Sequence, residues 1–530
     1  MKFKKQLALM LAALMLSASA LTACKNDDPN DDFDPDTPGD DFSGSIGKDD
    51  ETDDKEPATP VDEGDENATY YISNADELMA MKRKGTYILT ADIDITGKEW
   101  TPVGTFSAPF VGTFDGKGFT VKGLTVTKDS EGTGECISYT YTYSGLFGFA
   151  DGAKIQNLKL EDVNININPT AKARVVYAGA IAAMTRDTVI SNCKIVSGTV
   201  KCSSVFFKAY SAGITAFSLD SDFINCSVNA DVSATDSNVI SVSGGIVAHA
   251  GMNTLIACGS VNGSVTAVST DGNAYSGGLT GYLNNSDISH SEANANVKAE
   301  TKCSEAETGK AGASFAGGIA AYATNSLDKQ RSINVVGSRG TVTAVSADYV
   351  SYSGGITAYS SYIKLTEAYS SSDVIASSNS REVFAGGISG YVSVKTEYKG
   401  IFFVGTIKAD STGDVVRTGT VAAYDATTGS ENKAVIELAG RLTGSELSVT
   451  VNGKKYSVGD KLPEKEFFTS TGDEFTSNEL RSKNVLTGDL GWDAKNWSFS
   501  MATYPEVNPD GYLGKDMGIP ENNGTGNYTE

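Results

Sequence analysis

The stretch YSGGLTGY, Tyr275 to Tyr282, combines an aromatic residue, a pair of glycines, an aliphatic residue and a final tyrosine. The same frame returns as FAGGIAAY from Phe315, YSGGITAY from Tyr352 and FAGGISGY from Phe384. We take the aliphatic residue after the glycines as the anchor of each copy. Nine anchors recur along the chain: Leu146, Ile181, Ile214, Ile246, Leu279, Ile319, Ile356, Ile388 and Val421. Their spacing is 32 to 40 residues and mostly close to 33, which predicts a solenoid of repeated units.

The residues beside each anchor favour strands over helices. The residue two places after every anchor is Gly or Ala, and this alternation of aliphatic and small residues is the period of a strand with one face packed inward. A unit of this size cannot bury a core of its own, so successive units must stack on one another. We therefore expect an all-β fold, a parallel β-helix with about 33 residues per coil.

A second set of positions, twelve residues after the anchors, tests the same register. It contains Leu158, Cys193, Cys226, Cys258, Ser291 and Ala368. Equal offsets predict equal places on successive coils, so the three cysteines should form a column with the inter-strand spacing of about 4.8 Å. A disulfide between two of them would fit that distance. Because leucine and alanine share the column, we interpret it as a buried ladder of small apolar side chains.

Aromatic residues recur on both sides of the glycine pair. An odd offset from an inward anchor places the residue three positions later on the outer surface, where five tyrosines recur: Tyr282, Tyr322, Tyr359, Tyr391 and Tyr424. The aromatic residues four positions before the anchor share its parity and are predicted to point inward: Tyr177, Tyr210, Tyr275, Phe315, Tyr352 and Phe384. The five outer tyrosines are candidate ligand-binding residues, because exposed rings can stack on sugars or peptides. The alternative is that the rings only pack on one another.

The amino terminus reads as a targeting segment followed by a tether. Residues 1–23 combine early lysines with a short apolar run, as in a removed signal peptide. The sequence LTAC resembles the bacterial lipobox, which implies that Cys24 carries a lipid and anchors the protein to a membrane; the alternative is an ordinary signal peptide with an incidental cysteine. Residues 24–68 are rich in Asp, Glu and Pro and predict a disordered, extended tether. This acidic tether carries most of the net charge of −23.

Two stretches, SGLFGFADGAKIQNLKL from Ser144 and SGGLTGYLNNSDISHSEANANV from Ser276, resemble the GLUG motif of bacterial surface proteins. Residues 89–126 are similar to the segment that precedes such repeats, and LGWDAKNWSFSMATYP, Leu490 to Pro505, is similar to their ending. Several repeats depart from the motif, with Ala in place of its second glycine. The resemblance implies a right-handed parallel β-helix of the pectate-lyase-like kind, on exported proteins whose roles are mostly unassigned.

The ends of the solenoid are predicted to be capped. Residues 69–128 form the N-terminal cap and leading segment, 129–430 the repeat β-helix, and 431–530 a β-rich C-terminal cap and tail. Ser73, with Asp76 three residues later, predicts the N-cap of a short helix. Asn452 and Gly453 predict the turn of a hairpin. Such caps cover strand edges that would otherwise aggregate.

The sequence offers little catalytic chemistry. Its two histidines, His249 and His290, form no HExxH motif, which excludes a His-ligated metalloprotease site within this chain, although GLUG repeats also occur in some immunoglobulin-cleaving proteases. His249 takes the place of an outer aromatic residue and is expected to stack like one. Asp92, Asp94 and Asp115 are candidate carboxylates for polysaccharide chemistry or calcium, but Asp and Gly are also ordinary turn residues, the interpretation we favour. No catalytic residue, metal or cofactor is predicted.

These features predict a lipid-anchored protein of the bacterial cell envelope, exposed at the outer surface. Its elongated β-helix would bind glycans or components of a host or neighbouring cell, without catalysis, as a monomer. Nucleic acid is excluded as a partner because it requires clustered Lys and Arg. The alternative from another class is a surface polysaccharide lyase or glycoside hydrolase on the same scaffold. A third possibility is a purely structural envelope component.

Overall fold

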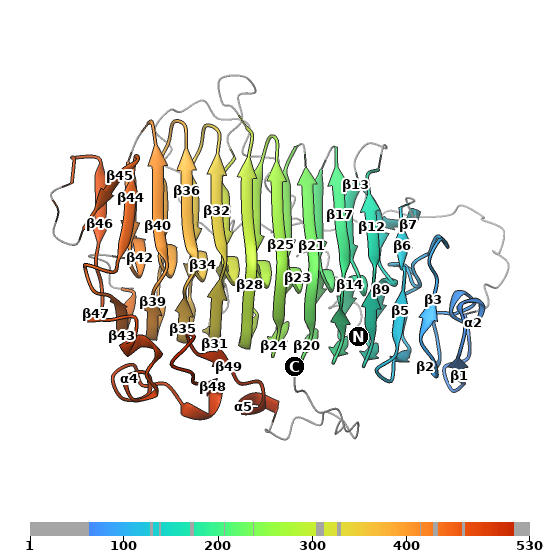
Figure 1. Ribbon diagram of the computed structural model, residues 1–530. Helices are drawn as coiled ribbons and strands as arrows, with labels where there is room; N and C mark the ends of the chain where they lie inside the picture. The colour runs from blue at the N-terminus through green and yellow to red at the C-terminus, as the bar shows by residue number, and fades with distance from the viewer. Residues whose placement is uncertain are drawn as a thin grey trace, which may run out of the picture. The chain divides into compact units, whose positions relative to one another are not determined.

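The computed structural model describes residues 63–513, except 128–130, 137–138, 170–173, 206, 237, 304–311, 326–329, 414, 428–432, 458–459 and 461. The signal peptide (1–23), Cys24 and the tether up to residue 62 lie outside the described residues. The described part is all-β with a few short helices, and its strands form a parallel β-solenoid of about nine turns (Figure 1). The predicted fold class is confirmed.

One coil illustrates the repeat. Strand β26 (Asn273–Gly277) lies in sheet C, β27 (Thr280–Asn284) in sheet B and the long β28 (Asp287–Thr301) in sheet A. The glycine pair Gly277–Gly278 separates the first two strands, and a turn separates the second from the third. Each strand pairs in parallel with its equivalents in the neighbouring coils, so the three sheets run along the stack.

Sheets B and C each take one strand per coil, except that sheet C also holds β7, which pairs antiparallel with β8. The other strands of sheet B are β9 (Phe147–Asp151), β14 (Ala182–Arg186), β19 (Thr215–Leu219), β23 (Val247–Gly251), β30 (Ala320–Thr324), β34 (Thr357–Ser361), β38 (Ser389–Val392) and β42 (Ala422–Asp425). Those of sheet C are β7 (Glu131–Cys136), β8 (Tyr139–Ser144), β13 (Arg174–Gly179), β18 (Lys208–Ala212), β22 (Ile240–Gly244), β29 (Ser314–Gly317), β33 (Ser351–Gly354), β37 (Val383–Gly386), β41 (Val416–Gly419) and β46 (Glu466–Thr469).

Sheet A is the largest and bends in the middle of each coil. Its remaining strands are β1 (Thr69–Ile72), β2 (Thr86–Leu89), β3 (Ile93–Asp94), β4 (Thr113–Asp115), β5 (Thr120–Lys122), β6 (Thr125–Val126), β10 (Lys154–Gln156), β11 (Lys159–Glu161), β12 (Val163–Ile167), β15 (Val189–Ser191), β16 (Lys194–Ile195), β17 (Gly198–Ser204), β20 (Asp222–Ile224), β21 (Ser227–Asp236), β24 (Leu255–Ala257), β25 (Ser260–Ser269), β31 (Arg331–Arg339), β32 (Thr341–Ser346), β35 (Ile363–Ser370), β36 (Asp373–Ser378), β39 (Glu397–Phe403), β40 (Thr406–Ser411), β43 (Val435–Leu442), β44 (Ser448–Val451), β45 (Lys454–Tyr456) and β47 (Asp473–Phe475).

The anchors form the spine of the core. All nine are at most 1% exposed. The backbone N–H of Ile319 donates to the carbonyl of Ile356, and the N–H of Ile356 donates to that of Ile388, at 2.9 and 2.8 Å. Each anchor therefore lies directly on the next, and the packed column removes apolar surface from water that a single coil would leave exposed.

Both ends of the described solenoid carry the predicted cap elements. Helix α2 (Ala75–Met79) begins at Asn74 and not at Ser73, because the Asn74 side chain accepts the N–H of Glu77; Glu77 in turn accepts the N–H of Ser73 at 2.7 Å. At the other end, β44 and β45 pair antiparallel around Asn452 and Gly453, which both have positive φ, as predicted. Among the described residues, no helix has the length and hydropathy needed to cross a membrane.

The chain then returns along the stack. After β47 come the 3₁₀ helix η2 (Glu479–Arg481), α4 (Lys483–Gly488), the 3₁₀ helix η3 (Ala494–Asn496), β48 (Trp497–Ser498), β49 (Glu506–Val507) and α5 (Asp510–Leu513). Figure 1 shows these elements running from the last coils back toward β24, against one edge of sheet A. We call residues 490–513 the strap.

Candidate functional site

The glycine pair lets the chain turn from sheet C into sheet B. A Cβ on Gly317 would lie 1.9 Å from the carbonyl oxygen of Ala320, and one on Gly318 would lie 2.0 Å from that of Gly355. Real side chains never approach a backbone so closely, so the turn excludes a larger residue at both places. In coils with the GG pair the close backbone approach therefore requires both glycines, whereas other coils hold Ser144, Ala180, Ala212 or Thr420 at one of the two places.

Two ladders of aromatic rings fill this corner, and we call it the aromatic corner. In the outer ladder, the ring centroids of Tyr282 and Tyr322 lie 5.0 Å apart, and those of Tyr322 and Tyr359 lie 4.4 Å apart, nearly parallel in both cases. The second ladder stacks Tyr275 on Phe315 at 4.8 Å. The two ladders meet edge to face, as where Phe315 contacts Tyr322 at 5.6 Å and 84°.

The second ladder corrects one prediction. The aromatic residues four positions before the anchors, such as Phe315, do not point into the core but lie on the same side as the outer tyrosines. The core instead receives the residues on either side of them, such as Val176 and Ala178 beside Tyr177. Strand parity fails here because the glycine turn interrupts the alternation between these residues and the anchor.

The five candidate ligand-binding tyrosines all belong to the outer ladder. Tyr359 is 2% exposed, and Tyr282, Tyr322, Tyr391 and Tyr424 are partly buried. From Tyr282 to Tyr391 each ring covers the face of the next, with 5.3 Å between the centroids of Tyr359 and Tyr391, whereas Tyr424 is tilted by 53° and has the Arg417 guanidinium 4.3 Å from its centroid. A sugar stacks on a ring face, and in this ladder the faces are occupied by neighbouring rings. Their role in ligand binding stays a prediction, limited to contact through ring edges and hydroxyls.

Burial shifts the pKa values of the titratable groups in the aromatic corner toward their neutral forms. Burial raises the pKa of Tyr282 to about 12. Burial, with a smaller contribution from Lys208, lowers the pKa of His249 to about 3, and the His249 ring stacks on Tyr282 at 5.0 Å. Lys208 itself is 1% exposed, and burial lowers its pKa to about 7. The geometry supports the interpretation of His249 as a stacking residue.

A second corner runs along the bend of sheet A. One residue per coil there has a left-handed backbone, with φ between 47° and 64°. We call this set the bend column: Asn157, Asn192, Asn225, Cys258, His290, Val335, Glu367, Gly400 and Leu438. In the first three coils the asparagine side chains bond along the stack, with Asn225 Nδ2 donating to Asn192 Oδ1 at 2.8 Å. Asparagine tolerates this backbone conformation better than most residues.

The bend column corrects the predicted cysteine ladder. Cys193 and Cys226 do lie together in the core, but Cys258 stands one position earlier, beside Asn225, and Gly259 takes the inward place. The reason is one extra residue in the turn before β24: three residues separate β23 from β24, whereas two separate β19 from β20. Cys193, Cys202, Cys226 and Cys258 are free thiols, which agrees with the preference for packing over disulfides.

The strap covers the later part of the bend column. The indole N–H of Trp492 donates to the Gly400 carbonyl at 2.7 Å. The Glu367 carboxylate accepts the backbone N–H of Asp493, the side-chain amide of Asn496 and the indole N–H of Trp497, at 3.0 to 3.2 Å. The rings of Trp492 and Trp497 stack at 4.1 Å, and both residues are 3% exposed. The strap, which is distant in the sequence, therefore covers this part of the bend column.

His290 belongs to the same covered region. Its Nε2 lies 3.1 Å from Asn496 Oδ1, and its Nδ1 lies 2.7 Å from Ser289 Oγ. Because Asn496 directs its amide N–H to Glu367, its oxygen faces the histidine, and His290 Nε2 carries the proton. Sequence reasoning missed this cluster. The available signal was the change from asparagine to other residues at one repeated position.

The three candidate aspartates of the leading segment each accept a backbone N–H, within a local turn for Asp94 and Asp115 and from a distant strand for Asp92. Asp92 accepts the N–H of Thr120 at 2.7 Å, and Asp94 accepts that of Thr96 at 2.8 Å. Burial alone would raise the pKa of Asp115, but hydrogen bonds from Asn157 and Lys117 hold it below its usual value. In the part of the chain that the structure describes, no group of three or more His, Cys, Asp or Glu side chains could hold a metal ion.

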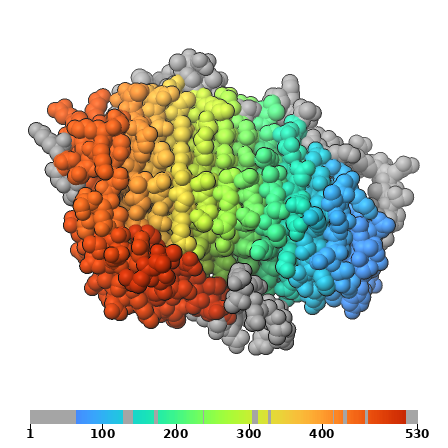
Figure 2. Space-filling view, viewed as in Figure 1, coloured from blue at the N-terminus to red at the C-terminus, as the bar shows by residue number. Residues whose placement is uncertain are grey.

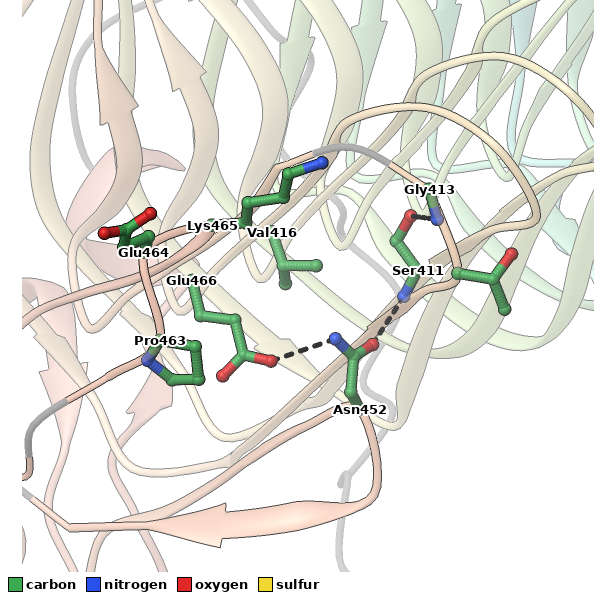
Figure 3. Close-up of a pocket in the computed structure, with 9 residues that line it drawn as sticks. Ser411, Gly413, Val416, Asn452, Pro463, Glu464, Lys465 and Glu466 are labelled. Atoms are coloured by element: carbon green, nitrogen blue, oxygen red, sulfur yellow. Dashed lines mark hydrogen bonds between the residues drawn. The ribbon is translucent and has the colours of Figure 1, made fainter.

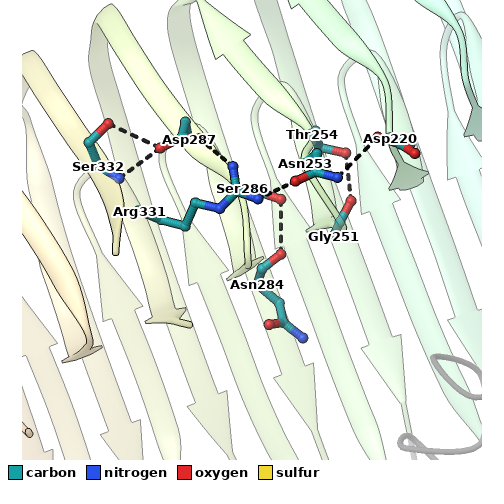
Figure 4. Close-up of polar contacts among 9 residues, drawn as sticks. All are labelled: Asp220, Gly251, Asn253, Thr254, Asn284, Ser286, Asp287, Arg331 and Ser332. Atoms are coloured by element: carbon teal, nitrogen blue, oxygen red, sulfur yellow. Dashed lines mark hydrogen bonds and ion pairs between the residues drawn. The ribbon is translucent and has the colours of Figure 1, made fainter. Parts of the chain in front are cut away.

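A polar network links the turns between sheets B and A (Figure 4). Arg331, 8% exposed, donates to Asp287 Oδ2 at 2.9 Å and to Asn253 Oδ1. Asn253 donates to Asp220 at 3.3 Å, and Asp287 also accepts the N–H of Ser332 at 2.7 Å. The network connects four successive coils. It pairs arginine with carboxylates on a lateral face, as a polysaccharide lyase would require, but its charged groups are committed to one another.

A shallow hollow lies near the last coils (Figure 3). Its volume is about 330 Å³, and it is lined by Ser411, Thr412, Gly413, Val416, Asn452, Pro463, Glu464, Lys465 and Glu466. Asn452 crosses it, donating to Glu466 at 3.0 Å and accepting the N–H of Ser411 at 2.8 Å. None of these side chains forms a nucleophile–base pair.

The second half of sheet A presents an open lateral face. Figure 1 shows its strands side by side, and Figure 2 shows the same face covered by side chains in rows along the stack. The first column contains Asn164, Thr199, Asp231, Ser264, Asn296, Thr341, Asp373, Thr406 and Ser448. The second contains Asn166, Lys201, Ser233, Thr266, Lys298, Thr343, Ile375, Lys408 and Thr450. The third contains Ser203, Thr235, Val268, Glu300, Val345, Ser377 and Asp410. We call these three columns the polar face.

Comparison with solved structures gives five matching chains, two of which are described here by name. A crystal structure named "putative immunoglobulin A1 protease from Bacteroides ovatus" shares 15% identity, covering 83% of this chain and 92% of that chain, with a TM-score of 0.30. A structure named IgA1 Protease shares 15% identity over 82% of this chain and 25% of that chain, with a TM-score of 0.36. At these values the matches say nothing about the activity of this chain. No family model and no curated protein matches it.

Proposed function

We propose that this protein is a lipid-anchored binding protein of the bacterial cell surface, which holds an extended ligand against its solenoid without catalysis. The polar face carries this proposal. Fifteen of the 25 positions in its three columns are Ser, Thr or Asn, and they recur at equivalent places on successive strands. Short polar side chains lose little rotamer entropy when a ligand covers them.

Rigidity supports the same function. Three sheets join each coil to the next. Equivalent positions within a column therefore recur about every 4.8 Å along the stack. A long ligand can therefore make many weak contacts at once, and their combined affinity exceeds that of any single contact.

The surface location rests on the sequence alone. The lipobox-like LTAC ending at Cys24, the acidic tether and the resemblance to GLUG repeats support it. If Cys24 is lipidated, the Cys24→Ser variant will be released from the membrane fraction, and radiolabelled palmitate will label only the unchanged protein. Equal labelling of both proteins would contradict the proposed anchor.

The alternative of a polysaccharide lyase or glycoside hydrolase is tested by its products. The Cys24→Ser protein is incubated with acidic and neutral polysaccharides, and binding and new reducing or unsaturated ends are both measured. Binding without new ends supports the proposal. New ends that appear in proportion to enzyme would overturn the non-catalytic function.

The five outer tyrosines are a second, smaller proposal for ligand contact. Tyr282→Phe, Tyr322→Phe and Tyr391→Phe together keep the ring stack and remove three hydroxyls. Weaker binding of a ligand found by the polysaccharide screen would assign the hydroxyls to it. Unchanged binding would leave the outer ladder with packing alone.

A further inference from the structure

The polar face holds three lysines and four carboxylates, and two of the lysines are paired within the face. Lys298 pairs with Glu300 at 2.8 Å, and Lys408 pairs with Asp410 at 3.3 Å. The remaining acids are also engaged: Asp231 accepts the Ser264 hydroxyl, and Asp373 accepts the Thr406 hydroxyl. Lys201 stands alone among neutral neighbours in its column. The face therefore offers no cluster of positive charge to attract a polyanion.

The face is also poorly suited to a peptide. An extended peptide binds either by adding to a free sheet edge or by placing alternate side chains in apolar pockets. The backbone groups of these strands are consumed by pairing with both neighbours, as in β25 between β21 and β28. The apolar residues of the face are three partly buried side chains in its second and third columns, Val268, Val345 and Ile375.

Hydroxyl and amide side chains match a different chemistry. Ser and Thr hydroxyls and Asn amides each donate and accept hydrogen bonds, as sugar hydroxyls do. In the second column, Thr266 and Thr343 flank Lys298 on successive strands, and Ser233 precedes them. Because each column presents a side chain in every coil, a polymer of similar units can bind along the stack.

We infer that the polar face binds an uncharged polysaccharide, laid along the stack and hydrogen-bonded by the first and second columns. This inference rests on the proposed binding function and adds the ligand class and the surface. Because the bonds are between neutral groups, binding should depend little on salt, whereas attraction of a polyanion weakens as salt rises.

The test compares a neutral glucan with its carboxymethylated and sulfated forms, using the Cys24→Ser protein at low and high salt. The expected result is binding of the neutral polymer with similar affinity at both salt concentrations. Preference for the charged forms, with loss at high salt, would overturn the inference about the ligand class while leaving a binding function in place.

The surface is tested by the triple variant Thr199→Val, Thr266→Val and Thr343→Val, which keeps side-chain shape and strand preference. Loss of three hydrogen bonds should weaken binding on the order of tenfold or more. The matched control is Thr86→Val, Thr113→Val and Thr366→Val, on the half of sheet A before the bend, with affinity unchanged. Equal affinity of both triple variants would overturn the assignment to this face. Absence of binding to any polysaccharide, neutral or charged, would overturn the proposed function as well.

Discussion

The two long corners of the solenoid are filled in opposite ways. In the aromatic corner every coil supplies its own rings, and each ring contacts the rings of the coils beside it. In the first three coils of the bend column, neighbouring coils also bond to one another, through the asparagine side chains. The later coils are covered by the strap. Cys258, in the fourth coil, contacts Pro509, which is 251 residues away in the sequence.

The difference shows that a repeat protein can have contacts that extend beyond neighbouring repeats. Stability in a solenoid is approximately a sum of terms for each repeat and each interface. The aromatic corner follows that rule. The strap adds contacts shared by several coils, so the coils from Cys258 to Leu438 should open together, and the coils of Asn157 to Asn225 should open independently.

The largest expected effect comes from Trp492→Ala. Removing this buried ring from Trp497 and Gly400 should lower the free energy of unfolding by about 3–5 kcal/mol. Hydrogen exchange should accelerate over all the coils under the strap, whereas Tyr322→Ala should accelerate it only in the adjoining coils. Acceleration confined to the coil of Gly400 would show that the strap does not couple the coils.

Glu367→Ala should have the next largest effect. Three donors of the strap would lose a charged acceptor, at a cost of about 1.5–3 kcal/mol in chemical denaturation. The control is Glu437→Ala, an exposed carboxylate paired with Lys399 at 3.7 Å, with an expected cost below about 1 kcal/mol. Similar costs for both variants would contradict a special role for the strap contacts.

His249 gives the aromatic corner a pH dependence. Its pKa is about 3 in the folded protein against 6.5 in the unfolded chain, so protons bind preferentially to the unfolded chain as the pH falls below 6.5. Stability due to this group is complete above pH 6.5 and falls by about 1.4 kcal/mol per pH unit below it. His249→Phe, which copies Phe217 of the preceding coil, should remove that slope in urea titrations at several pH values. Parallel curves for the two proteins would contradict burial of the imidazole.

The smallest effect is expected in the uncovered part of the bend column. Asn225→Ala puts alanine, which tolerates left-handed backbone less well than asparagine, at φ 53° and should cost about 1–2 kcal/mol, more than Asn225→Gly, although both lose the bond to Asn192. Thermal unfolding of the two variants measures the difference. If Gly were as destabilising as Ala, the ladder bond and not the backbone would determine the residue type.

The fold could be predicted because its cause is local and repeated. The anchors, the pitch, the strands and the Asn452–Gly453 turn each depend on a few adjacent residues. The same locality explains the errors. A one-residue insertion before β24 moved Cys258 out of the cysteine column, and the glycine turn reversed the side to which Phe315 points.

The covered corner could not be predicted in the same way. Glu367, His290 and Trp492 come together because a distant segment folds back, and no periodic pattern records that contact. The polar face was accessible in principle, since its Ser, Thr and Asn recur at equal offsets. Its columns become visible only when the strand register fixes which residues are adjacent.

The contacts of the strap also depend on the correct order of the coils. Trp492, Asn496 and Trp497 follow the coils that they contact in the sequence, and their partners Gly400, Glu367 and His290 belong to three different coils, with the coil of Val335 between those of His290 and Glu367. A chain that skipped or slipped one coil would present these partners out of step and leave two tryptophans exposed. Closure of the strap thus distinguishes a correctly counted stack from a miscounted one.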